Sequence, residues 1–317
     1  MTMAPAAPTS AKLVVVTGAG GFVGSQVALE LTAAGFEVLA TDQHFDVATT
    51  TRLAELRRIE APLAAALDQA AGLQPFAVIH GAAITAGPAS FGVTPAHHLR
   101  LNSDMLTLCL DWARGVAAAR FIFLSSTAVF AAGDGAGSVT ETSAATARGP
   151  YSAAKKAGEI LTQGAADAGF ATLSLRLGSM YGPYEAARPT RPGIGLMARM
   201  FAGAQAGLIR VETPHARRDW TWLPDIGRAI AALLHDFPSE TIDVLHCGNT
   251  EQISDLALAR LICAHFPGAK VEADPPPYPA SKAPMGRSIR SVLTEFDWTP
   301  LDQALPQMLK TDRSAKR

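Results

Sequence analysis

The stretch that decides the fold reads Val16-Thr17-Gly18-Ala19-Gly20-Gly21-Phe22-Val23-Gly24. An apolar run beginning at Leu13 precedes it, and a helical pattern with one apolar face follows it as far as Gly35. Glycines 18, 21 and 24 predict, in that order, a tight turn, a close approach of backbone to a ligand, and close packing of a helix on a strand. The stretch therefore predicts a strand, a glycine turn and a helix whose N-terminus faces a phosphate group.

A carboxylate follows at the end of the next apolar run. That run, from Glu37 to Thr41, stops at Asp42, which lies 24 residues after Gly18. An acid at about this spacing hydrogen-bonds the adenine ribose of a dinucleotide, and its charge repels a 2′-phosphate. No Lys or Arg stands in the adjoining Gln43-His44. The pattern predicts NAD rather than NADP as the cofactor; the alternative for Asp42 is an ordinary turn acid.

Further apolar runs alternate with helical stretches, which is typical of βαβ units and a parallel sheet. The runs cover residues 77–80, 121–124 and 171–177, and the third strand is expected near Arg58 to Leu63. After Tyr181, Gly and Pro break the pattern. We expect an α/β fold, a Rossmann-like doubly wound parallel sheet in residues 12–180, with a smaller, mainly substrate-binding part in 181–317. Some segments of that part, such as a strand at 241–246, should return to the main sheet.

Composition favours a small-molecule partner. The 317 residues are 48% hydrophobic and 17% charged, with a formal net charge of -1. Nucleic-acid and membrane-surface proteins normally carry a basic excess, so both classes are disfavoured. No apolar run approaches the roughly 20 residues of a membrane helix, and the start lacks the order of a secretory signal, so a cytoplasmic location is expected. The three cysteines are widely spaced and predict neither disulfides nor a metal site.

Hydroxyl groups emerge where the strand at 121–124 ends, in Ser125-Ser126-Thr127. Downstream, Tyr151 and Lys155 stand one helical turn apart on the same face. A phenol with a pKa of about 10 is a poor base at neutral pH, but a neighbouring ammonium and an oxidised nicotinamide favour the phenolate. We expect Tyr151 to take a proton from a substrate hydroxyl, Ser126 to hydrogen-bond the same oxygen, and Lys155 to tune Tyr151 and hold the nicotinamide ribose.

Together these motifs resemble the extended short-chain dehydrogenase/reductase family, the NAD-dependent epimerase/dehydratase family. The resemblance runs from Leu13 to about Leu309. Besides the residues above, it rests on His80-Gly81-Ala82-Ala83, Asn102, Arg176, Tyr181-Gly182-Pro183, Arg218-Asp219-Trp220, Asp225 and Phe296-Asp297-Trp298-Thr299-Pro300.

The resemblance implies roles for single residues. Phe22 and Val23 would donate backbone N–H groups to the pyrophosphate, and Ala82 would line the adenosine side. The spacing to the following valine assigns the acting hydroxyl to Ser126, with Thr127 as the fallback. A homodimer is implied, through helices such as those expected at residues 102–114 and 151–168.

Departures from the family pattern bear on the substrate. Thr127 and Ala128 stand where family 4,6-dehydratases have an Asp-Glu pair, which disfavours dehydration and decarboxylation. Arg176-Leu177-Gly178-Ser179-Met180 lacks the Asn that contacts a nucleotide diphosphate and is similar to the Arg-x-Gly-Ser of uronate dehydrogenases. Ser179, Arg188 and Arg218 are therefore candidate substrate residues, and the arginines indicate an anionic, sugar-like molecule. Alternatively, the arginines are paired with acids.

These features predict an NAD-dependent oxidoreductase or epimerase that acts on a secondary hydroxyl of a sugar or sugar acid. A nucleotide-sugar 4-epimerase, such as one for UDP-sugars, is the alternative within the same chemistry. A non-catalytic NAD-binding sensor is the alternative from another class, although a sensor needs no activated phenol.

Overall fold

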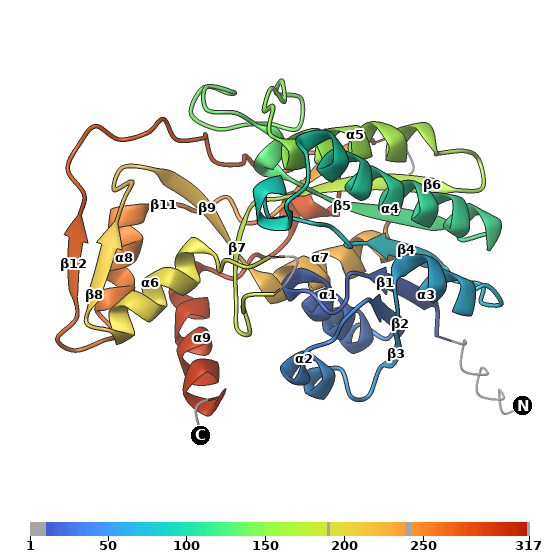
Figure 1. Cartoon of the computed structure of the whole chain (residues 1–317), viewed down its shortest axis with the longest axis horizontal. Coiled ribbons are helices and arrows are strands. Elements are labelled where there is room, and N and C mark those ends of the chain that lie inside the picture. The colour runs from blue at the N-terminus through green and yellow to red at the C-terminus, as the bar shows by residue number, and fades with distance from the viewer. Residues whose placement is uncertain (1–10, 189–190, 239–241, 316–317) are drawn as a thin grey trace, which may run out of the picture.

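The main body of the molecule is a seven-stranded parallel sheet (Figure 1). The computed structural model describes residues 11–188, 191–238 and 242–315. The strand order is β10-β6-β5-β4-β1-β2-β3, which confirms the doubly wound parallel sheet. Its strands are β1 (Leu13–Thr17), β2 (Glu37–Asp42), β3 (Arg57–Glu60), β4 (Ala77–His80), β5 (Arg120–Ser126), β6 (Ala171–Leu177) and β10 (Val244–Cys247).

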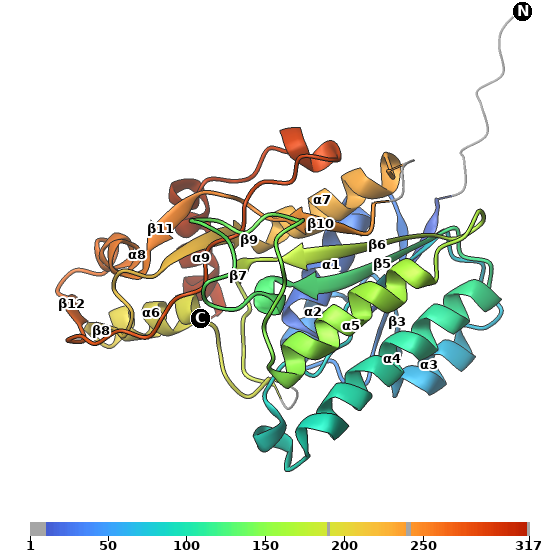
Figure 2. The same ribbon diagram turned by 90° about the horizontal axis from the view of Figure 1, so that it is seen from above.

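Helices cover both faces of this sheet (Figure 2). One face packs against α1 (Phe22–Ala33) and α7 (Leu223–His235), and the other against α3 (Leu63–Gln69), α4 (Pro95–Gly115) and α5 (Pro150–Gly164). Successive side chains of β1 point to opposite faces: Val14 and Val16 join the cluster with α1 and α7, and Val15 joins the one with α4. This two-sided burial explains why the strand is an uninterrupted apolar run.

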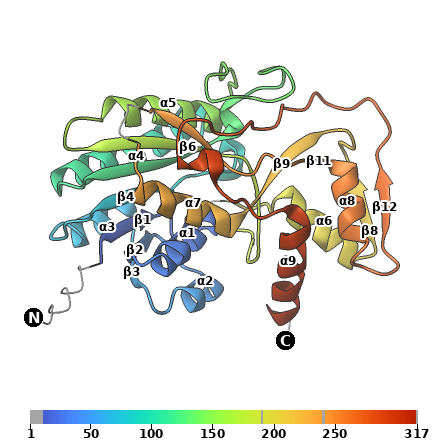
Figure 3. The same ribbon diagram turned by 180° about the vertical axis from the view of Figure 1, so that it is seen from behind.

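The smaller part has its own sheets and core (Figure 3). Met197, Phe201, Trp220 and Leu258 are among the apolar side chains buried there. Its elements are β7 (Ser179–Tyr181), α6 (Leu196–Gln205), β8 (Leu208–Val211), β9 (Arg217–Trp222), β11 (Gln252–Ser254), α8 (Asp255–Cys263), β12 (Lys270–Ala273) and α9 (Leu301–Ala315). Short segments complete the chain: α2 (Val47–Arg52), η1 (Pro88–Phe91), η2 (Thr127–Val129) and η3 (Val292–Glu295). Within the described residues, none of the helices combines the length and apolar character needed to cross a bilayer.

Three ends of helices and strands differ from those predicted from the sequence. The third strand ends at Glu60 rather than Leu63, because Pro62 turns the chain into α3. Helix α5 ends at Gly164 rather than Ala168, and Asp167 caps the following turn by accepting the N–H of Gly169 at 2.8 Å. The returning strand is β10, which begins at Val244; Thr241 lies outside the described residues. These ends depend on the conformation of single turn residues, and the spacing of apolar residues does not predict it.

A glycine sets the distance between α7 and the helix that follows the glycine turn. A Cβ atom on Gly227 would lie 2.4 Å from Cβ of Glu30 in α1. Real Cβ atoms do not approach so closely, and the obstacle is not the movable end of a side chain. Close packing of α7 on α1 therefore requires glycine at this position, and it supports the helix that begins at the glycine turn.

We predict that Gly227→Ala lowers the free energy of unfolding by about 1–3 kcal/mol, because the added methyl group overpacks the helix contact. Gly164→Ala is the matched control, since an added Cβ there meets nothing within 4 Å. The control should leave stability unchanged or raise it by up to about 1 kcal/mol, as alanine favours helix. Urea unfolding followed by tryptophan fluorescence measures both; equal stability of the two variants would contradict the prediction.

Candidate active site

One cavity of about 920 Å³ opens at the carboxyl ends of the sheet strands. This is the edge where ligands of open α/β sheets bind, and the volume lies in the range of small-molecule sites. All of the site residues predicted from the sequence line it except Thr127: Gly18, Gly21, Phe22, Val23, Asp42, Ala82, Ser126, Tyr151, Lys155, Ser179, Arg188 and Arg218.

The glycine turn is built by backbone-on-backbone contact. Gly18 has a φ of +74°, and a Cβ on it would lie 2.6 Å from the backbone N of Ala82. A Cβ on Gly24 would lie 2.2 Å from the carbonyl oxygen of Gly18. The N-cap of α1, Gly21, offers no side-chain cap within the described structure, so the first N–H groups of the helix face the cavity uncapped. Such an end is an anion site.

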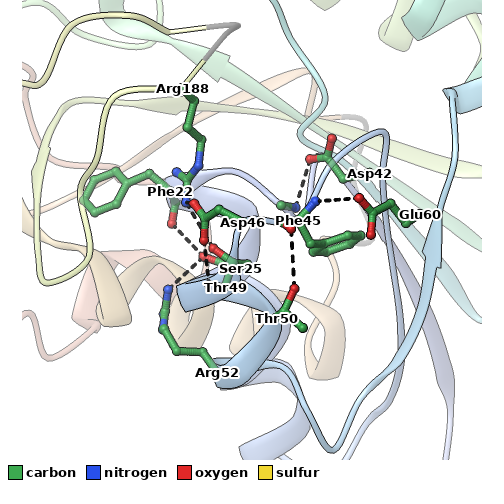
Figure 4. Close-up of polar contacts among 11 residues, drawn as sticks. Phe22, Ser25, Asp42, Phe45, Asp46, Thr49, Thr50, Arg52, Glu60 and Arg188 are labelled. Atoms are coloured by element: carbon green, nitrogen blue, oxygen red, sulfur yellow. Dashed lines mark hydrogen bonds and ion pairs between the residues drawn. The ribbon is translucent and has the colours of Figure 1, made fainter. Parts of the chain in front are cut away.

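Asp42 lies beside this turn at the end of β2 (Figure 4). Its Oδ2 accepts the N–H of Gly20 at 2.9 Å, and Oδ1 accepts the N–H of His44 at 3.4 Å. Burial raises the pKa of this carboxyl, while the backbone amides and the charge of Arg188 oppose the increase. The contact with Gly20 was not predicted from the sequence, because it depends on how the turn folds back onto β2.

Behind the turn, His80 has a structural place. Its Nδ1 lies 2.9 Å from the Oγ1 of Thr17, and the same Oγ1 accepts the N–H of Ala82 at 3.4 Å. Burial lowers the pKa of His80 to about 3, and the charge of Lys155 adds to this. A neutral, buried imidazole that holds the ends of β1 and β4 together fits a packing role.

The three hydroxyls at the end of β5 have different surroundings. Ser125 donates to Oε1 of Glu159 at 2.6 Å, and Thr127 lies 3.2 Å from Nζ of Lys282, which also donates to its carbonyl oxygen at 2.8 Å. Ser126 lines the cavity together with Tyr151, and its hydroxyl acts to lower the pKa of that phenol. Its Oγ also accepts the N–H of Ala128 at 3.1 Å. Of the three, Ser126 is the one that both lines the cavity and influences the pKa of Tyr151.

Tyr151 and Lys155 follow one another along α5, as the spacing predicts. Burial raises the pKa of Tyr151 to about 12, and the hydrogen bond with Ser126 and the charge of Arg191 act in the opposite direction. The Nζ of Lys155 lies 5.7 Å from the centroid of the Tyr151 ring and donates to the carbonyl oxygen of Leu124 at 2.6 Å. In this geometry Arg191 is the cation that favours the phenolate.

A buried ion pair stands behind the lysine. Arg176 donates to both carboxylate oxygens of Glu159 at 2.8 Å, and both side chains are 7% exposed. Burial lowers the pKa of Lys155 to about 7, and the negative charge of Glu159 opposes this decrease. Glu159 was not predicted as a site residue, although it repeats the four-residue spacing that joins Tyr151 to Lys155.

The predicted substrate arginines are paired with carboxylates. Arg218 forms a bidentate pair with Asp255 at 2.8 and 3.0 Å, and Arg188 pairs with Asp46 at 3.1 Å. Both still line the cavity, as does Arg191, which pairs with Glu185 at 2.6 Å. The described residues contain no group of three or more His, Cys, Asp or Glu placed to hold a metal ion.

Comparison with known proteins identifies the family. The profile of the NAD dependent epimerase/dehydratase family matches residues 14–244, most of the chain. The chain belongs to the NAD-dependent epimerase/dehydratase family. No curated protein sequence matches it.

Several solved structures have a similar fold although their sequences are only distantly similar to this chain. UDP-glucose 4-epimerase from Thermotoga maritima is 20% identical, with a TM-score of 0.78 over 96% of this chain and 100% of its own. The NDP-hexosamine 5,6-dehydratase TunA is 23% identical, with a TM-score of 0.77 over 95% and 98%. MoeE5 in complex with UDP-glucuronic acid and NAD is 21% identical, with a TM-score of 0.75 over 96% and 99%.

NAD is the cofactor of this family member, and the residues present fit it. The uncapped start of α1 suits the pyrophosphate, and the glycines at 18, 21 and 24 leave room for it. Asp42 presents a carboxylate at the end of β2, where the adenine ribose binds in such folds. Lys155 lies at the other end of the cavity, where it would hold the nicotinamide ribose.

We predict that Asp42→Asn reduces the preference for NAD over NADP about tenfold or more, the factor that about 1.4 kcal/mol represents. Asparagine keeps an oxygen for the N–H of Gly20 but removes the charge that repels a 2′-phosphate. Titration calorimetry with each dinucleotide gives the ratio of the two dissociation constants. An unchanged ratio would mean that Asp42 does not select the cofactor.

The lysine predicts a pH dependence of stability. Its pKa is about 7 in the folded chain and 10.5 in its ordinary state, so between these values the unfolded chain binds more protons and stability rises with pH. Lys155→Met should lose this contribution, and its free energy of unfolding should rise less than that of the wild type between about pH 7 and 9.5. Lys156→Met, at an exposed neighbour, is the control and should follow the wild-type curve in urea unfolding.

Proposed function

We propose that this chain is an NAD-dependent oxidoreductase or epimerase that acts on a secondary hydroxyl of a sugar or sugar acid. The observation that carries the proposal is that Ser126, Tyr151 and Lys155 line the same cavity as the glycine turn. Two hydroxyl groups in one cavity, with a buried lysine one helical turn after the tyrosine, provide groups for removing a proton from an alcohol.

The roles of the residues follow from their contacts. NAD, when bound, supplies the acceptor for the hydride that leaves the substrate carbon. Tyr151 takes the proton of the substrate hydroxyl, and Ser126 hydrogen-bonds the same oxygen. With a pKa raised to about 12 by burial, Tyr151 needs nearby positive charge, and Arg191 acts in this direction. Lys155, one helical turn along α5, holds the nicotinamide ribose.

Two features support an anionic substrate. Arg191 and Arg218 line the cavity with side chains about one third exposed, at 37% and 36%. A guanidinium paired on one side still offers donors to a second carboxylate or phosphate. Ser179 lines the same wall and is a candidate for a substrate hydroxyl or carboxylate. Since the Arg-x-Gly-Ser pattern resembles that of uronate dehydrogenases, a sugar acid is the preferred substrate class.

A nucleotide-sugar 4-epimerase is the second candidate. A smaller cavity of about 200 Å³, lined by Arg210 and Thr213, has Leu196 and Arg218 in common with the wall of the main one. Space beside the main cavity would suit a substrate longer than a free sugar acid. Structurally similar proteins include a UDP-glucose 4-epimerase with UDP-glucose, which supports the same alternative. A dehydrogenase releases NADH after each turnover, whereas an epimerase returns the hydride and keeps NAD bound.

We also propose a homodimer through α4 and α5. These helices pack side by side on one face of the sheet (Figure 2). Leu108, Ile160 and Leu161 on them are 40% or more exposed. Exposed apolar side chains on adjoining helices are typical of an interface between copies. Light scattering tests this, and the mass of one chain at micromolar concentration would exclude the dimer.

The substrate panel tests the proposed function. Absorbance at 340 nm is followed with NAD and a set of uronic acids, aldonic acids, free sugars and UDP-sugars. NADH formed with one sugar acid would establish a dehydrogenase. Interconversion of a UDP-sugar pair without net NADH, in protein that retains NAD, would establish the epimerase. Activity on none of them would overturn the proposal.

We predict that Tyr151→Phe lowers kcat by about 10²–10⁴-fold on the substrate found, because the general base is lost. NAD binding should remain within about threefold of the wild type, since the phenol contributes little binding energy. Stopped-flow kinetics and calorimetry measure the two quantities. Full activity of Tyr151→Phe would exclude Tyr151 as the base. If the wild type and the variant both bind NAD and neither turns over any substrate, the protein is a sensor.

A further inference from the structure

The loop after β7 crosses from the smaller part of the molecule to the cofactor side. Its described residues, 182–188 and 191–195, form part of the wall of the main cavity through Ala186, Arg188, Arg191 and Gly195. The glycine turn and Asp42 line the same cavity. The loop therefore shares the wall of the dinucleotide cleft with the elements expected to bind the adenosine half.

Arg188 makes the direct contact between the two sides (Figure 4). Its Nη2 donates to Oδ2 of Asp46 and to Oγ1 of Thr49, both at 3.1 Å. Asp46 is the N-cap of α2, the short helix that follows β2, and its Oδ1 accepts the N–H of Thr49 at 2.7 Å. The Arg188 side chain is 14% exposed and that of Asp46 is 34% exposed. The attraction between the two charges is therefore screened less by water than in a fully exposed ion pair, although salt can still reach it.

A second contact runs beside the first. The guanidinium of Arg52, in α2, lies 4.3 Å from the ring centroid of Tyr184 on the loop. The same guanidinium donates to Oγ of Ser25 at 3.2 Å and to Oε1 of Gln26 at 2.7 Å, both in α1. Tyr184 is thus stacked on a side chain that is already fixed to the phosphate-binding helix. We call the contacts of Arg188 with Asp46 and of Tyr184 with Arg52 the clasp.

The loop is anchored at its base. Glu185, whose side chain is 3% exposed, accepts the N–H of Gly195 at 2.8 Å and pairs with Arg191 at 2.6 Å. Arg191 in turn lies 6.0 Å from the ring centroid of Phe22, the first residue of α1. These contacts hold Glu185 in place independently of the two contacts of the clasp. The clasp can therefore open without unfolding the smaller part.

We propose that the clasp closes over the adenosine half of bound NAD and sets the rate at which the cofactor leaves. A dinucleotide held between the glycine turn and the loop cannot dissociate until Arg188 parts from Asp46. The ion pair thus acts as a positioning contact that determines how long NAD stays bound. This inference rests on NAD binding alone and does not depend on the substrate.

The test is the dissociation of NADH from the full chain. Protein loaded with NADH is mixed with excess NAD, and the loss of NADH fluorescence gives the off-rate. Asp46→Asn keeps the side-chain oxygen that caps α2 but removes the charge; Arg188→Gln removes the other partner. Each variant should raise the off-rate about tenfold, and the double variant should add little to either single one, because both remove the same interaction.

Salt and a matched pair supply the controls. The wild-type off-rate should rise with ionic strength, while that of Arg188→Gln should rise less, because screening acts on the partly exposed pair. Arg57→Gln breaks the exposed pair with Glu37, 2.8 Å apart at the amino ends of the parallel strands β2 and β3, and should leave the off-rate unchanged. Thermal unfolding without cofactor shows whether each variant is folded. If Arg188→Gln is not folded, Arg188→Lys, which retains the charge, takes its place and should give an off-rate between that of the wild type and a tenfold increase.

Three results would overturn the clasp. One is an off-rate unchanged in either single variant of the pair. Another is a double variant whose effect equals the product of the two single effects, since independent residues do not form a latch. The third is an equal increase in Arg57→Gln. Loss of catalytic activity in these variants is not a criterion, so a wrong assignment of the substrate leaves this test intact.

Discussion

The arrangement of the site depends on direct contact between backbones at the turn after β1. Gly18 packs against the backbone of Ala82, and Gly24 packs against the carbonyl of Gly18. Side chains at these positions would separate β1, β4 and α1 by a distance that the buried Val14, Val15 and Val16 core does not tolerate. Because these contacts fix the start of α1, they also fix where an anionic pyrophosphate meets the helix N-terminus, and every other cofactor contact is arranged around that point.

Several of the buried charged side chains form ion pairs. Glu159 is held by Arg176 and Ser125, Asp255 by Arg218, and Glu185 by Arg191. Each pairing satisfies groups that would be costly to bury alone, and each stands next to a residue of the cavity. The clasp follows the same principle at the cofactor end. The loop that carries Arg188 and Arg191 lines the cavity and also contacts α2, so the cavity and the segment after β2 are joined by one loop.

Local patterns predicted most of the fold and much of the site. Glycine spacing, the strand that ends at Asp42 and the Tyr151–Lys155 repeat each depend on backbone geometry over a few residues, and such geometry is legible in a linear chain. The predicted ends of β3 and α5 were wrong because turns determine where these elements stop. Pro62 ended β3 early, and the residues after Gly164 left α5 short of its expected end. Spacing to the following valine favoured Ser126 over Thr127 as the acting hydroxyl. The contact of Thr127 with Lys282, 155 residues away, could not be predicted from that spacing.

The amino-acid sequence is enough to predict the kind of cofactor site, because one turn and one strand end carry the residues suited to a pyrophosphate and a ribose. Which charges face one another depends instead on how distant segments pack. Asp46 and Arg188 are 142 residues apart, and Glu141 and Arg290 are 149 apart. No local pattern relates such partners; they meet because segments far apart in the sequence pack against one another in the folded chain. The sequence identified Arg188 as a cation of the pocket, but its partner emerged from the way the loop after β7 packs across α2.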